Sequence, residues 1–277
     1  MEEPAAPRDL PFADPIASGV LGGRIAIVTG GGTGIGRATA SALARAGASV
    51  AICGRREEPI REVERELTAA GTACLALATD VRESEQVDAL LDAVDERFGR
   101  VDILVNNAGG QFAAAAEETS TKGMRAVHRL NVDAVWDVTT KVANRWMIPR
   151  RRGVIFAIGF SPRRGIPQMV HSSMARSALE TLASGLSLEW SRFGVRAICI
   201  ACGLIASEGL EGYGGSEVVK EWASQVPLGR AGSVDEVAAA IAFLSTDAAG
   251  YITGTTVMID GGADAWGLGF SPPVPDG

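Results

Sequence analysis

A glycine-rich turn near the start of the chain is the stretch whose residues are best suited to chemistry. It follows the apolar run 25–28, precedes the alanine-rich segment 37–46 and reads Thr29-Gly30-Gly31-Gly32-Thr33-Gly34-Ile35-Gly36. Glycine tolerates positive φ and, because it lacks a Cβ, lets backbone N–H groups come close to a phosphate. An ordinary βα turn would also contain glycine, but a strand before the turn and a helix after it predict a dinucleotide pyrophosphate site.

The end of the second apolar run refines the choice of dinucleotide. It reads Cys53-Gly54-Arg55-Arg56, where a protein that binds NAD normally has a carboxylate for the ribose hydroxyls. A guanidinium is planar, permanently charged and able to bind a 2′-phosphate, so Arg55 and Arg56 favour NADP(H) over NAD(H). The alternative is that they are two exposed arginines leading into a helix.

The elements that would position these residues alternate along the chain. Apolar runs predict strands at 25–28, 48–53, 74–81, 101–105, 154–158, 195–201 and 255–259. Helical periodicity between them predicts helices at 37–46, 57–71, 84–99, 121–148 and 170–192, and a capping box, Ser233 with Glu236, opens a last helix. Crossovers of this length predict an α/β fold: one doubly wound Rossmann-type domain with a parallel seven-stranded sheet and helices on both faces.

Residues 20–277 are expected to form this domain, residues 1–19 a flexible arm, and about 204–226 a lid over the substrate. A net charge of −7 and a pI near 5.0 argue against nucleic-acid binding. No long apolar window or signal peptide is present, which favours a cytoplasmic protein without a membrane partner.

The four cysteines are scattered along the chain and predict buried thiols rather than a metal site or a redox pair. Cys199 and Cys202 are expected on opposite faces of one strand.

The Thr-Gly-x-x-x-Gly-Ile-Gly spacing of the turn resembles that of the short-chain dehydrogenase/reductase family, and the resemblance extends over about Gly23 to Gly262. It implies that Asp80 binds adenine, although Asp80 could also cap the helix that begins near Ser84. The Asn106-Asn107-Ala108-Gly109 segment matches a family motif but could consist of turn residues. The resemblance assigns the cofactor to Gly30, Thr33, Gly34, Ile35, Gly36, Arg55, Arg56, Asp80, Val81, Asn106, Ala108, Gly109, Arg176, Gly203 and Ile205.

The sequence departs from the family at the catalytic positions. The family's asparagine is retained as Asn131, but its tyrosine and lysine align with Ser172 and Arg176. Gly159 and Phe160 occupy the serine position, with Ser161 the nearest hydroxyl. We therefore expect Asn131, Ser172 and Arg176 to form the catalytic set. The two histidines, His128 and His171, are expected to be surface or core residues rather than proton donors.

The segments around the replaced catalytic residues form motifs that differ from the usual family pattern. These segments are Gly109-Gly110-Gln111-Phe112, Lys122-Gly123 and 171–176. They resemble a family branch that includes peroxisomal trans-2-enoyl-CoA reductases and bacterial citronellol or citronellal dehydrogenases. Reduction of a ketone forms an alkoxide that needs a positioned acid, whereas reduction of a conjugated enoyl thioester forms an enolate that an arginine can stabilise. This favours an enoyl reductase. The alternatives are an alcohol or aldehyde dehydrogenase, a biosynthetic enzyme of altered chemistry, and a pseudoenzyme that only binds the dinucleotide. Candidate substrate contacts are Gln111, Phe112, Phe160, Ser161 and Tyr213.

The two long helices carry many large apolar side chains, among them Trp136, Trp146 and Trp190. In the family the matching helices pair subunits. We therefore expect a homo-oligomer, either a dimer or a tetramer.

Overall fold

The computed structural model describes residues 16–161, 166–207 and 221–266. Most of the predicted arm, the middle of the predicted lid and Tyr213 lie outside these residues. The main sheet has the strand order β3-β2-β1-β4-β5-β6-β9, and all its pairs are parallel. Its strands are β1 (Ile25–Thr29), β2 (Ser49–Gly54), β3 (Cys74–Ala78), β4 (Ile103–Asn106), β5 (Gly153–Phe160), β6 (Val195–Cys202) and β9 (Thr255–Ile259). The predicted single doubly wound domain is confirmed.

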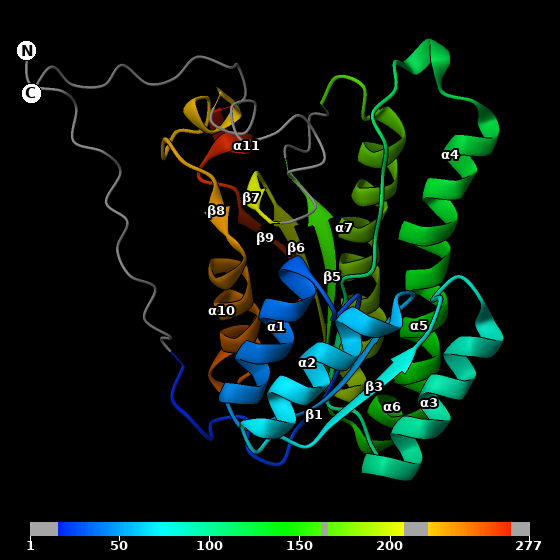
Figure 1. Cartoon of the computed structure of the whole chain (residues 1–277), viewed down its shortest axis with the longest axis vertical. Helices are drawn as coiled ribbons and strands as arrows, with labels where there is room; N and C mark the ends of the chain where they lie inside the picture. The colour runs from blue at the N-terminus through cyan, green and yellow to red at the C-terminus, as the bar shows by residue number, and fades with distance from the viewer. Residues whose placement is uncertain (1–15, 162–165, 208–220, 267–277) are drawn as a thin grey trace, which may run out of the picture.

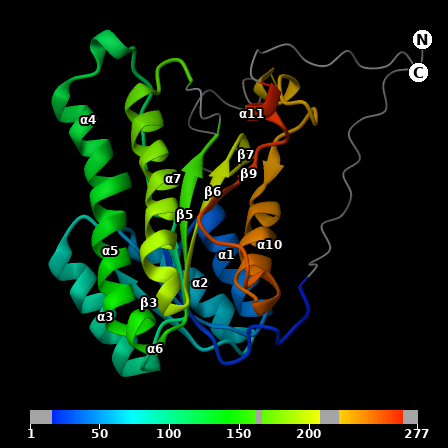
Figure 2. The same ribbon diagram turned by 180° about the vertical axis from the view of Figure 1, so that it is seen from behind.

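Helices cover both faces of the sheet, as the two opposite views show (Figures 1 and 2). One face carries α1 (Gly34–Arg45), α2 (Glu57–Ala69) and α10 (Val234–Leu244), and the other carries α3 (Ser84–Phe98), α5 (Ala134–Val142) and α7 (Val170–Trp190). Strand side chains alternate between the two cores: Val28 and Ile52 face one, and Ile27 and Leu104 face the other. A sheet buried on both faces explains why its strands are continuous apolar runs.

The predicted helix over 121–148 is interrupted twice by π-helical turns. The structure contains α4 (Thr121–His128), a π turn (Arg129–Asp133), α5, a second π turn (Ala143–Met147) and α6 (Ile148–Arg150). Such turns keep the axis continuous but add a residue to one turn, so they change which side chains face the sheet. The long helix predicted over 121–148 is thus present as one continuous helical segment, with two π turns that the sequence did not indicate. The first π turn contains Asn131.

Two smaller differences affect the site. β3 ends at Ala78, so Asp80 and Val81 lie in the turn after it rather than within the predicted strand 74–81. A short parallel pair that the sequence did not indicate, β7 (Ile205–Ala206) with β8 (Gly232–Ser233), connects the segment after β6 to the start of α10. The capping box at Ser233 and Glu236 is confirmed.

The four cysteines lie apart as free thiols, and Cys199 and Cys202 pack into different cores. Burial raises the pKa of Cys53, Cys199 and Cys202 to about 12, so the thiolate is strongly disfavoured. Within the described residues, no group of His, Cys, Asp or Glu is arranged to hold a metal, and no helix is long and apolar enough to cross a membrane.

Candidate dinucleotide and substrate site

The glycine turn forms a tight loop from β1 into α1, at the carboxyl edge of the sheet. Gly30 and Gly34 have φ of +66° and +53°, which L side chains rarely adopt. A Cβ on Gly36 would overlap the carbonyl oxygen of Gly30, and a Cβ on Gly31 would lie 2.7 Å from Cγ2 of Ile52. The turn therefore needs glycine both for its backbone angles and for its packing. Thr33 is the N-cap residue of α1, and no side-chain hydrogen bond caps this helix end. A pyrophosphate fits this arrangement of helix end and close backbone.

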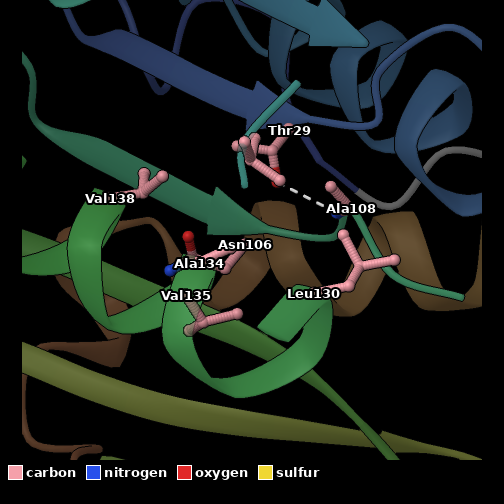
Figure 3. Close-up of a pocket in the computed structure, with 8 residues that line it drawn as sticks. Thr29, Asn106, Ala108, Leu130, Ala134, Val135 and Val138 are labelled. Carbon is pink, nitrogen blue, oxygen red and sulfur yellow. Dashed lines mark hydrogen bonds between the residues drawn. The ribbon is translucent and has the colours of Figure 1, made fainter. Parts of the chain in front are cut away.

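The segment after β4 holds this turn in place through Asn107, not Asn106. Asn107 Nδ2 donates to the carbonyl oxygens of Thr29 (2.9 Å) and Gly30 (3.2 Å). Thr29 Oγ1 in return accepts from the backbone N–H groups of Asn107 and Ala108, and Figure 3 shows the bond to Ala108. Asn106 is buried and donates to Thr139 Oγ1 of α5 instead. The cofactor role of Asn106 stays a prediction, and Asn107, which the sequence analysis named only within the family motif, is the residue of this segment that holds the glycine turn.

Small and branched apolar side chains pack behind the glycine turn, next to Thr29 and Asn106. Leu130, Ala134, Val135 and Val138 approach the ends of β1 and β4 from the π turn and α5 (Figure 3). Val81 is also buried there, so its side chain belongs to the core and only its backbone can reach a nucleotide. Ile35 likewise packs against the other core.

Arg55 and Arg56 follow β2 as exposed side chains, and Arg56 is the N-cap residue of α2. Asp80, which follows the neighbouring β3, is half-buried and bound by Arg82: Arg82 Nε lies 2.9 Å from Oδ1 and 3.2 Å from Oδ2. The hydrogen bonds of Arg82, together with the charge of nearby Arg55, hold the pKa of Asp80 below its usual value against the effect of burial. Asp80 does not cap α3, whose N-cap residue is Glu83. Arg82 is a second residue that the sequence analysis did not single out.

Arg176, Asn131 and Gly109 come together from three separate segments. A Cβ on Gly109 would lie 2.6 Å from Nη2 of Arg176 and 2.9 Å from Oδ1 of Asn131. Arg176 Nη1 also donates to the carbonyl oxygen of Ile158 in β5. A side chain at 109 would therefore displace the guanidinium of Arg176 or the amide of Asn131. The guanidinium is anchored by Ile158 at the end of β5, where the nicotinamide half of the site is predicted to lie.

Asn131 is fully buried in the first π turn, and its amide is committed to the backbone. Nδ2 donates to the carbonyl oxygens of Gly110 (2.9 Å) and Val127 (2.8 Å), and Oδ1 accepts from Gly110 N–H at 3.4 Å. One N–H group thus holds the segment after Gly109, and the other binds the preceding turn of the helix at Val127. In this arrangement Asn131 positions its neighbours, and its place in the catalytic set stays a prediction.

Two side chains at the start of α7 hold the segment 110–114. Ser172 is buried, and its hydroxyl donates to Oε1 of Gln111 over 2.5 Å. His171 stacks on Phe112 with ring centroids 4.3 Å apart, and its Nε2 donates to the carbonyl oxygen of Phe112 at 2.9 Å. Ala114 N–H donates to the carbonyl oxygen of Gln168. Since the hydroxyl of Ser172 binds the oxygen end of the Gln111 amide, the NH₂ end is directed elsewhere.

The residues at the serine position lie apart from this group. Gly159 has no room for a side chain, because a Cβ there would lie 2.7 Å from Sγ of Cys199. Ser161 is buried, and its hydroxyl donates to Oδ2 of Asp260 at 2.6 Å, which joins the ends of β5 and β9. Ser161 therefore holds the fold together here, while Phe160 is half-buried at the end of β5. Gly203 packs against Asp260, and Ile205 lines a cavity of about 500 Å³ with Leu228, Met258 and Gly261.

The chain is similar to known proteins over most of its length. Residues 30–264 match a protein-family model described as "Enoyl-(Acyl carrier protein) reductase". A peroxisomal 2,4-dienoyl-CoA reductase of Danio rerio is 34% identical over 249 residues, covering 88% of this chain and 82% of the relative. An L-fucose dehydrogenase of Bos taurus is 37% identical over 248 residues, covering 87% and 90%. The solved structure of a citronellol catabolism dehydrogenase of Pseudomonas aeruginosa PAO1 has a TM-score of 0.81 and 36% identity, covering 91% of this chain and 100% of that one.

Proposed function

The chain belongs to the short-chain dehydrogenase/reductase family and is an oxidoreductase, and on that premise we propose that it uses NADPH to reduce the conjugated C=C bond of an enoyl thioester. One observation supports this choice above the others. The groups that converge at the candidate site are hydrogen-bond donors, the amide of Gln111 and the guanidinium of Arg176, while the tyrosine and lysine positions of the family hold Ser172 and Arg176. Such a site can stabilise an oxyanion but lacks a strong proton donor.

The proposed binding mode of NADPH starts from the glycine turn between β1 and α1. The backbone of 30–36 would bind the pyrophosphate, Arg55 and Arg56 the 2′-phosphate, and Asp80 the adenine. Arg176, beside Gly109, would bind the nicotinamide ribose. When bound, NADPH supplies a hydride to the β-carbon of the enoyl group, which moves the electron pair of the C=C bond onto the thioester oxygen as an enolate.

The residues of this chain then act on that negative charge. The Ser172 hydroxyl holds Oε1 of Gln111, so that the Gln111 NH₂ group donates to the thioester oxygen. Arg176 adds a fixed positive charge beside Gly109. Asn131 binds the Gly110 carbonyl group and so holds the 109–111 segment, which includes Gln111, in position to contact the thioester oxygen. Arg176 cannot release a proton at neutral pH, so water protonates the α-carbon.

The second candidate is oxidation of an alcohol or reduction of an aldehyde. The similarity to the citronellol dehydrogenase structure and to the L-fucose dehydrogenase favours it. An alkoxide is far more basic than an enolate, and the site would have to protonate it without the family's tyrosine. We therefore rank this activity below enoyl reduction.

The test is spectrophotometric NADPH oxidation with a panel of enoyl thioesters, aldehydes and ketones, and NADP⁺ reduction with alcohols. Enoyl thioesters should give the highest kcat/KM. Turnover of alcohols or aldehydes together with inert enoyl thioesters would refute the proposal.

Two further assignments accompany the proposal. We place the enzyme in the cytoplasm on its sequence, although one relative is named peroxisomal. We also propose a homo-oligomer joined through the outer surfaces of α5 and α7, which expose the apolar side chains of Trp136, Val170, Met174 and Leu188. On α7, residues 170, 174 and 188 share one side of the helix, because they are spaced by about whole turns.

A further inference from the structure

The turn after β3 contains an ion pair to which the proposed binding mode gives no role. Asp80, the residue assigned to adenine, is bound at both carboxylate oxygens by the guanidinium of Arg82, whose Nε contacts both oxygens and whose Nη2 donates to Oδ2. The side chains are partly buried, with 19% of Asp80 and 30% of Arg82 exposed. The hydrogen bonds of Arg82 hold the pKa of Asp80 below its usual value, so the carboxylate is ionised at neutral pH. The pair therefore joins one full negative and one full positive charge.

This ion pair lies at the strand end next to Arg55. β2 and β3 are neighbours, Gly54 pairs with Ala78, and the Thr79 N–H donates to the carbonyl oxygen of Gly54 at 3.0 Å. Arg55 follows directly on one side of this hydrogen bond and Asp80 on the other. The charge of Arg55 also contributes to the low pKa of Asp80. The carboxylate thus lies within electrostatic range of the arginine that is proposed to bind the 2′-phosphate.

A carboxylate in this place opposes the binding of a phosphorylated cofactor. Adenine and the 2′-phosphate belong to one adenosine unit, so a carboxylate that contacts the adenine lies within about 10 Å of the phosphate, roughly one Debye length. The phosphate itself carries a charge of about −1.5 to −2. Without a partner, Asp80 would repel this phosphate and compete with it for Arg55. The guanidinium of Arg82 cancels the charge of Asp80 in its place.

We propose that Arg82 is a specificity-determining residue: by neutralising Asp80, it allows Arg55 to select the 2′-phosphate of NADPH over the free ribose hydroxyl of NADH. This rests on the proposed use of NADPH. Arg82 acts on the phosphate through Asp80, and its effect on cofactor choice is electrostatic.

The turn is held by contacts that do not use the Arg82 side chain, so its charge can be changed separately from its position. The Arg82 backbone N–H donates to Oδ1 of Asp80 at 3.1 Å, and the Asp80 N–H donates to Oε1 of Gln86 at 2.8 Å. The Glu83 N–H donates to the carbonyl oxygen of Asp80 at 3.0 Å. The neighbouring carboxylate of Glu83 is itself paired with Arg129 of the first π turn at 2.9 Å. Substitutions at 80 and 82 therefore change the charge of one defined pair.

The experiment varies that charge in four proteins. The pair is neutral in the parent, carries one negative charge in Arg82→Gln and one positive charge in Asp80→Asn, and is neutral again in Asp80→Asn/Arg82→Gln. Calorimetric titration gives Kd for NADPH and NADH, and their ratio removes effects common to both cofactors, such as a lost adenine contact. Arg82→Gln should lower the preference for NADPH by about fivefold and leave NADH nearly unchanged. The double variant should recover the parent ratio, Asp80→Asn should equal or exceed it, and added salt should reduce the differences.

Arg145→Gln is the matched control. Arg145 lies in the second π turn, binds the carboxylates of Asp92 and Asp95, and is 33% exposed, close to the value for Arg82. This variant should leave both dissociation constants unchanged.

An equal loss of NADPH and NADH affinity in Arg82→Gln would show a structural role and overturn the proposal, as would an unchanged ratio. A double variant as poor in NADPH preference as Arg82→Gln would show that Arg82 does not act through Asp80. A parent protein without a preference for NADPH would refute the proposed cofactor. The role of Arg82 would still be decided in that case, because the ratio should fall in Arg82→Gln and recover in the double variant.

Discussion

The proposed preference for NADPH rests on individual side chains, and Arg55 is the residue to change first. Its exposed guanidinium replaces the carboxylate that would repel a 2′-phosphate, and it forms no ion pair within the described chain. We expect Arg55→Ala to weaken NADPH binding by about 1.5–3 kcal/mol, the value of one charge-assisted hydrogen bond, and to leave NADH nearly unchanged. Calorimetric titration of both cofactors checks this. Equal affinity of the parent protein for NADH and NADPH would show that the preference was assigned wrongly.

Arg176 and Ser172 are distinguished by what each contacts. Arg176 lies against Gly109 and Ile158, whereas Ser172 reaches the site only through Gln111. With an active thioester, Arg176→Ala should lower kcat by about a hundredfold, as for one lost charge-stabilising group, and Ser172→Ala should cost less. Steady-state kinetics with Arg176→Lys as the conservative control makes the comparison. An unchanged kcat in Arg176→Ala would remove that residue from the mechanism.

Much of the site could be predicted from residue types, but the contacts between distant residues could not. The glycine turn, the two arginines after β2 and the altered catalytic positions were all readable from the sequence. The hydrogen bond from Ser172 to Gln111 joins residues 61 positions apart, and Asn107 reaches the glycine turn from 77 positions away. The hydrogen bond from Ser161 to Asp260, 99 positions away, could not be foreseen either, and the substrate contact of Ser161 stays a prediction.

At the scale of the element, the turn between β1 and α1 is the least tolerant of change. Gly36 lies against the Gly30 carbonyl group and Asn107 Nδ2. Gly36→Ala should therefore displace the turn and abolish measurable dinucleotide binding. Gly71→Ala is a useful control, because nothing lies within 4 Å of its Cβ position and its strain comes from its φ of +86° alone. Fluorescence titration with NADPH, with circular dichroism as a check on folding, separates loss of the site from loss of the fold. Normal binding by Gly36→Ala would contradict the close packing described here.

Strands and helices were predicted well because both faces of the sheet are buried and the apolar runs are long. The π turns could not be found in this way, since one extra residue in a turn leaves the apolar pattern of a long helix nearly unchanged. Their effect is local but important, because the first one contains the buried Asn131 that holds Gly110.

For the whole molecule, the prediction of subunit pairing from three tryptophans needs revision. Trp146 is buried in its own subunit, where its Nε1 donates to Asp95, and Trp190 packs against the core. Only Trp136 of the three is largely exposed, at 52%. Of these three tryptophans, only Trp136 is therefore well placed for the proposed subunit contact.

We expect the parent protein to be a dimer or tetramer at micromolar concentration. Trp136→Glu should shift it towards monomers, because a buried unpaired charge opposes association. Light scattering after size exclusion measures this, and Trp222→Glu, an exposed tryptophan outside α5 and α7, is the control. A monomeric parent protein would rule out the proposed assembly.

The central claim is that the enzyme transfers hydride to a carbon–carbon double bond rather than to a carbonyl group. It is tested most directly by incubating the enzyme with NADPH deuterated at the transferable position of C4 and an enoyl-CoA, and by locating the label by mass spectrometry and NMR. We predict a saturated thioester with one deuterium at the β-carbon and a solvent proton at the α-carbon. Deuterium on a carbinol carbon of an alcohol product, with the C=C bond intact, would contradict the account.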